Sequence, residues 1–157
     1  WLMVGEPMQA LKETDRLLAL HPDFEYGLWV RGLSQQALGR WVEAAATFSH
    51  LRDRWTLGWP ELGRAAVAAI DGDRSGVERS LEGLSGRETG FEQGMILAQL
   101  GDLDRAFDLV RSEWPLPWAE TLYLYVHRDR PLDTLRADPR FAAFMDDVQG
   151  SWRTDAV

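Results

Sequence analysis

The sequence predicts an all-α fold, an α-solenoid of antiparallel helix hairpins with a C-terminal capping helix. The first observation behind this prediction is a glycine turn that recurs at Gly5, Gly39, Gly72 and Gly101, with spacings of 34, 33 and 29 residues. A period of this size indicates supersecondary units that bury their apolar faces only by stacking on each other. The second observation is that the segments between these glycines carry apolar residues at helical spacing.

The period divides a single domain, residues 1–157, into four units and a C-terminal extension. The units cover about residues 1–23, 24–57, 58–86 and 87–114, and C-terminal helices cover 115–150. In the first unit, Pro7 suits the first turn of a helix, and Pro22 disfavours helical geometry at the residue before it. We therefore expect the first unit to be a truncated hairpin with one helix.

In each later unit the sequence predicts two helices, one before and one after the turn glycine. The expected pairs are 24–38 with 41–54, 61–70 with 76–84, and 91–100 with 103–114. In the second unit, Ala44, Phe48 and Leu51 lie at positions i, i+4 and i+7, which forms an apolar stripe for packing on the partner helix. Gly39 is expected to end the first helix of this unit as a left-handed cap.

The C-terminal extension predicts a helix over 117–127 and a last helix that begins near Asp138. Asp138 can cap free backbone N–H groups, and Pro139 suits the first helical turn. A terminal helix over the open end of a repeat array supports its solubility. The expected buried stripe of the last helix is Phe141, Phe144, Met145 and Val148.

Several residues recur at fixed places in the units. Ala44 lies four residues before Phe48, and Pro22 follows Ala10 in the first unit. Gly32 and Gly94 each lie seven residues before a turn glycine, and the third unit has Ala65 in place of this Gly. With these features, residues 1–114 resemble divergent tetratricopeptide repeats, a family that sets an Ala four residues before a Phe and a Pro near the end of each unit. The resemblance implies that the two helices of a unit cross at the small residues.

The extension carries a second resemblance. The stretch from Leu135 to Phe141, which reads Leu-Arg-Ala-Asp-Pro-Arg-Phe, is similar to the ends of repeat regions in bacterial multidomain signalling proteins, such as nucleotide cyclases, serine/threonine kinases and winged-helix regulators. This resemblance implies a regulatory parent protein. The chain also begins at Trp1 without an initiator Met or a basic leader, so we expect it to be a piece of a longer protein.

Composition narrows the class of partner. The formal net charge is −8, which repels a phosphate backbone, so we expect no nucleic-acid binding. The chain has no Cys, which excludes disulfides and thiolate chemistry and fits the cytoplasm, with a periplasmic or extracytoplasmic location left open. The apolar run over 65–70 is far shorter than the roughly 20 residues that span a bilayer, so no membrane insertion is expected.

One motif points to a different chemistry. Residues 71–82 satisfy the written EF-hand pattern, with Asp71 and Asp73 at loop positions one and three, Gly76 at six and Glu82 at twelve. The eighth position, which is usually apolar, is Glu78. We favour an inter-helix turn over a calcium loop, and we expect no resident metal and no cofactor. Neither the three His nor any Ser, His and Asp arrangement supports catalysis, so no enzyme is predicted.

The family resemblance implies that the first helix of each unit lines an inner groove. A carboxylate clamp of the kind known in this family requires Asn and Lys, whereas this chain has no Asn and Lys12 alone. Large apolar side chains there would anchor a peptide or helix, although aromatic residues at helical spacing are also common in cores. The implied groove residues are Tyr26, Trp29, Leu33, Gln36, Trp59, Leu62, Ala66, Glu88, Phe91, Met95 and Gln99.

The sequence thus predicts a non-enzymatic module that binds a protein or peptide in its concave groove, as part of a larger regulatory protein. The alternative is self-association into a homo-oligomer, or a spacer that positions a catalytic or DNA-binding domain. A calcium-binding module through residues 71–82 is the third hypothesis.

Overall fold

The computed structural model describes residues 5–51, 59–82, 84, 89–112 and 132–154, with the side chains of residues 148–154 left aside. All regular structure in these ranges is helical, which confirms the all-α prediction. The described residues do not include the predicted helix at 117–127 or Glu88, and the described side chains do not include that of Val148. The helices are α1 (Pro7–Leu20), α2 (Glu25–Ala37), α3 (Trp41–Leu51), α4 (Trp59–Ile70), α5 (Arg74–Leu81), α6 (Gly90–Gln99), α7 (Leu103–Ser112), α9 (Asp133–Ala137) and α10 (Arg140–Thr154).

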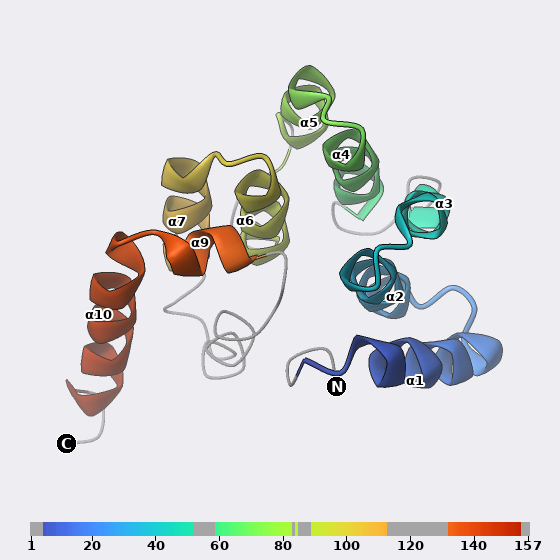
Figure 1. Cartoon of the computed structure of the whole chain (residues 1–157), viewed down its shortest axis with the longest axis horizontal. Helices are drawn as coiled ribbons and strands as arrows, with labels where there is room; N and C mark the ends of the chain where they lie inside the picture. Colours follow the sequence, from blue (N-terminus) through green and yellow to red (C-terminus); the bar gives the residue numbers. More distant parts are fainter. Residues whose placement is uncertain (1–4, 52–58, 83, 85–88, 113–131, 155–157) are drawn as a thin grey trace.

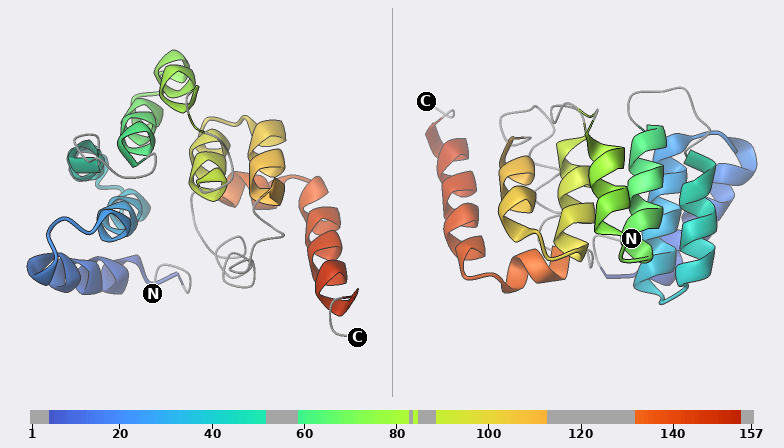
Figure 2. Two further views of the ribbon diagram at one scale, coloured as in Figure 1. Left: turned by 180° about the vertical axis from the view of Figure 1, so that it is seen from behind. Right: turned by 90° about the horizontal axis from the view of Figure 1, so that it is seen from above.

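The described helices follow one another along an arch, with α1 at one end and α10 at the other (Figure 1). Each of α1 to α3 packs on the next helix in the chain. Helix α4 packs on α5 and on α6, and α6 packs on α7. In the same view, α2, α4 and α6 lie nearer the inside of the arch, while α3, α5 and α7 lie outside. Seen from above, the helices from α2 to α7 stand side by side with similar tilts (Figure 2).

The turn glycines close three helices in the same way. Gly39, Gly72 and Gly101 have φ of 74°, 71° and 76°, which confirms the left-handed cap expected at Gly39. After each glycine, the next N–H donates to a carbonyl five residues earlier in the chain. The three bonds are Arg40 N to Gln35 O at 2.9 Å, Asp73 N to Ala68 O at 2.8 Å and Asp102 N to Leu97 O at 3.0 Å. Gly5, with φ of 77°, holds the equivalent place before α1.

Burial follows the same register. The residue five places after the turn glycine is buried in all four cases, at Ala10, Ala44, Val77 and Ala106. The residue nine places after it is also buried in all four cases, at Thr14, Phe48, Leu81 and Val110. The outer helices α3, α5 and α7 therefore present one repeated apolar stripe to their inner partners.

Small residues allow these helices to cross closely. A Cβ added to Gly32 in α2 would lie 2.8 Å from Phe48 Cδ1 and closer still to Phe48 Cε1 in α3. A Cβ on Gly94 in α6 would lie 2.8 Å from Val110 Cγ2 in α7. Ala65, at the same register in α4, is fully buried. The predicted crossing positions are therefore points of close approach between helices.

Several predicted helix boundaries were wrong by one or two residues. Helix α5 begins at Arg74 and not at Gly76, because the Asp73 carboxylate accepts a hydrogen bond from Gly76 N at 2.9 Å and caps the helix two residues earlier. Helix α4 begins at Trp59 and not at Glu61. The start of α10 confirms the cap predicted at Asp138, whose Oδ1 accepts from Arg140 N at 2.9 Å.

Candidate functional site

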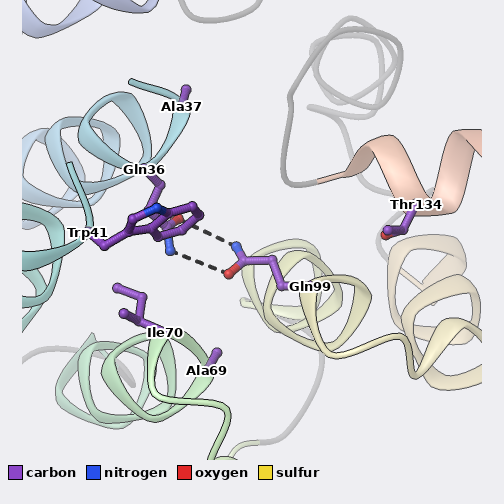
Figure 3. Close-up of a pocket in the computed structure, with 7 residues that line it drawn as sticks. All are labelled: Gln36, Ala37, Trp41, Ala69, Ile70, Gln99 and Thr134. Carbon is purple, nitrogen blue, oxygen red and sulfur yellow. Dashed lines mark hydrogen bonds between the residues drawn. The ribbon is translucent and has the colours of Figure 1, made fainter. Parts of the chain in front are cut away.

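A pocket of about 580 Å³ opens where the C-terminal ends of α2, α4 and α6 meet on the inside of the arch (Figure 3). Two places in the repeat build most of it, namely the third and the second residue before each turn glycine. Because stacked units put equal register positions on one surface, these helix ends converge. The lining residues are Gln36, Ala37, Trp41, Ala69, Ile70, Gln99 and Thr134.

Two carboxamides bridge this pocket. Gln36 Nε2 donates to Gln99 Oε1 at 3.3 Å, and Gln99 Nε2 donates to Gln36 Oε1 at 3.5 Å. The two residues are 63 positions apart and come from α2 and α6, and Figure 3 shows their side chains pointing toward one another. Both bonds exceed the usual N–H···O length of about 2.9–3.0 Å, so the pair is weak in energy and easily opened.

Trp41 forms an apolar wall of the pocket beside this pair. Its side chain is 53% exposed although it belongs by spacing to the buried stripe of Ala44 and Phe48. Side chains on a helix lean toward the N-terminus, so the first residue of α3 extends past the turn at Gly39 and over the end of α2. None of the lining residues within the described ranges is charged, and Ile70 with the alanines supplies further apolar surface.

The structure places most of the predicted groove residues in the core. The indole of Trp29 packs on Phe48 with a ring centroid distance of 5.1 Å. This burial corresponds to the core alternative that the sequence leaves open, and such side chains are not accessible to a ligand in this conformation. The buried members are Trp29, Leu33, Leu62, Ala66, Phe91 and Met95.

Four other predicted groove residues with described positions lie in two places. Gln36 and Gln99 meet in the pocket described above, and Gln36 is also buried. Tyr26 and Trp59 form an edge-to-face pair at 6.4 Å, and Trp59 also contacts the core through Trp29 at 6.0 Å. Trp41, Ile70 and Thr134 were not among the predicted residues, although Ile70 lies two residues before its turn glycine, in the same register as Gln99.

The calcium hypothesis does not fit the geometry of residues 71–82. Helix α5 covers Arg74 to Leu81, so the middle of the pattern is helical and Glu82 lies at the far end of that helix from Asp71. The Asp73 carboxylate caps α5. No group of three or more His, Cys, Asp or Glu side chains is placed to hold a metal ion within the described ranges.

Comparison with protein-family models, with curated proteins and with solved structures finds no match. The resemblance to tetratricopeptide repeats therefore rests on the sequence pattern. Among the helices with described residues, none combines the length and apolar character that crossing a membrane requires.

Proposed function

We propose that this chain is a non-enzymatic, tetratricopeptide-like α-solenoid module that binds a peptide or helix of a partner protein on its concave face. The observation that carries the proposal is the pocket shared by the ends of α2, α4 and α6. Its volume lies within the range of about 300–1,000 Å³ that is usual for ligand sites. The module would act as part of a larger regulatory protein, as the resemblance of its C-terminal stretch implies.

The chemistry of the pocket supports protein binding over catalysis. An exposed Trp beside apolar side chains is the type of anchor that dominates protein interfaces. Recognition would use Trp41 and Ile70 as contact surface and the carboxamides as hydrogen-bonding groups. The lining residues that the structure describes include no His, Cys, Asp, Glu, Lys or Arg that would serve as a general acid, a general base or a nucleophile.

The test compares two exposed residues that follow each other in α3. Trp41 lines the pocket, whereas Val42 is 86% exposed and is not part of the lining. Affinity capture from a lysate of the source organism is expected to retain a partner on the wild type and on Val42→Ser, and to lose it on Trp41→Ser. Both variants should keep the wild-type circular dichroism, because neither residue is buried.

If Trp41→Ser captures the same proteins as the wild type, the pocket is not the binding site. Trp29 and Phe91 are unsuitable for this test, since both are core residues and their replacement would measure folding.

Self-association is the second candidate function. Apolar side chains are exposed around the junction of α1 and α2, far from the pocket, and Leu20 is 77% exposed. A second copy of the chain would cover such a patch in a symmetric dimer. The patch consists of Leu17, Leu20, Phe24 and Tyr26.

A further inference from the structure

We propose that the pocket selects an uncharged peptide segment that carries a side-chain carboxamide, Gln or Asn, next to an apolar residue. This inference rests on the proposed function, because it names the chemistry of the segment that the same pocket would take. It arises from the two carboxamides across the pocket and from the uncharged side chains of the described lining residues.

The hydrogen-bonding capacity of the pair is only half used. A carboxamide has two N–H groups and two oxygen lone pairs. In the bridge, Gln36 and Gln99 each use one N–H group and one lone pair. Neither side chain has another hydrogen-bond partner among the described residues. Gln36 is only 6% exposed, so its remaining groups have little access to water. A ligand that bonds both carboxamides would satisfy groups that are otherwise costly to bury.

The arrangement of the bridge specifies which ligand group fits. Gln36 and Gln99 form a cyclic pair, in which each carboxamide donates and accepts on the same side. A ligand carboxamide forms the same cyclic pair, because its N–H and C=O also lie on one side. A trans main-chain amide does not, since its N–H and C=O point in opposite directions. After it pairs with one Gln in this way, a ligand carboxamide still has one N–H and one oxygen lone pair for the other Gln, so it can replace both long bonds of the bridge.

The lining also disfavours a charged ligand. A carboxylate resembles a carboxamide in shape, but it has no N–H to donate, and the described residues of the lining include no Lys or Arg to balance its charge. Transfer of an unpaired charge from water into such a site is strongly unfavourable. An apolar neighbour in the ligand would lie against Trp41 and Ile70, which form the apolar part of the lining.

The experiment is selection from a random nonapeptide display library on the wild type, Trp41→Ser and Val42→Ser. Peptides enriched on the wild type and on Val42→Ser, but not on Trp41→Ser, are expected to be uncharged and to contain Gln or Asn beside an apolar residue. Peptides that depend on Trp41 but carry charges or lack a carboxamide would overturn this inference and leave the proposed function intact. Finding no peptide that depends on Trp41 would overturn both.

Synthetic analogues of an enriched peptide, blocked at both ends, then test the carboxamide directly. Replacing its Gln by Glu or by Met is expected to weaken binding roughly 10-fold to 100-fold, because a hydrogen-bonding group is lost and its pocket partners stay unpaired. The Gln99→Leu variant should bind the Gln peptide at least about tenfold more weakly and the Met peptide without loss. Equal affinities for the three peptides would overturn the inference.

Discussion

Single residues in this chain show two distinct uses of glycine. An added Cβ on Gly39, Gly72 or Gly101 would meet nothing within 4 Å, so these turns need glycine for its backbone conformation alone. At Gly32 the reverse holds, because the backbone is helical and the missing side chain makes room for the Phe48 ring. The sequence distinguishes the two kinds only through their position in the repeat.

The close approach at Gly32 gives a prediction at the scale of one residue. Gly32→Ala forces the buried Phe48 ring to move, which costs about 1–3 kcal/mol of overpacking, while the gain in helix propensity returns at most about 1 kcal/mol. We expect a net loss of stability on the order of 1 kcal/mol in urea denaturation. The double variant with Phe48→Leu should recover part of this loss, and stability unchanged by Gly32→Ala would contradict the close contact.

Some features of the candidate site could be predicted from the residue pattern and others could not. Register from the turn glycines predicted the caps, the crossings and the apolar stripes, because these depend on contacts within one unit. Burial of Trp29, Leu62 and Met95 depends on how far one unit overlaps the next, which helical spacing does not contain. The Gln36–Gln99 bridge depends on curvature over three units, and no local pattern encodes it.

At the scale of elements, α10 is held on α7 by alternating aromatic and arginine side chains. Phe107 packs edge to face on Phe144 at 5.8 Å, and the Arg140 guanidinium lies 4.9 Å from the Phe107 ring centroid. Arg140 also forms ion pairs with Asp104 on α7 and with Asp138, the residue that caps α10. These contacts place the predicted terminal helix beside α7, on the side chains of Asp104 and Phe107.

The link between Asp138 and Arg140 predicts a pH dependence. Hydrogen bonds from the Arg140 side chain and backbone lower the pKa of Asp138 from 3.8 to about 2. Because the pKa is lower in the folded state, the ionised carboxylate contributes stability above pH 3.8, and this contribution disappears as the pH falls toward 2. NMR titration of the Asp138 carboxyl carbon should give a midpoint near pH 2.

The matched variant for this titration is Arg140→Gln, which removes the cation and its side-chain bonds to Asp138. The midpoint should then move up toward the ordinary value of 3.8. A wild-type midpoint already near 3.8 would show that α10 is not capped through this pair in solution.

At the scale of the whole molecule, the two candidate functions predict different states of association. If the concave pocket serves another protein, sedimentation velocity should show a monomer whose mass does not change with concentration. If a second copy covers the patch at α1 and α2, a dimer should form, and Leu20→Ser should dissociate it, because this substitution removes an exposed apolar side chain from the interface. Val42→Ser is the control, because it also removes an exposed apolar side chain, but from α3 and outside the patch.

The contacts among α2, α3, α4 and α6 form a closed circuit. Helix α2 packs on α3, α3 on α4 and α4 on α6, and the two carboxamides join α6 back to α2. Without the carboxamide bridge, these four helices would form an open series, in which α2 and α6 are joined only through α3 and α4. The bridge is also the place where a ligand would enter. A molecule that separates Gln36 from Gln99 would therefore open the circuit and free α2 to move relative to α6.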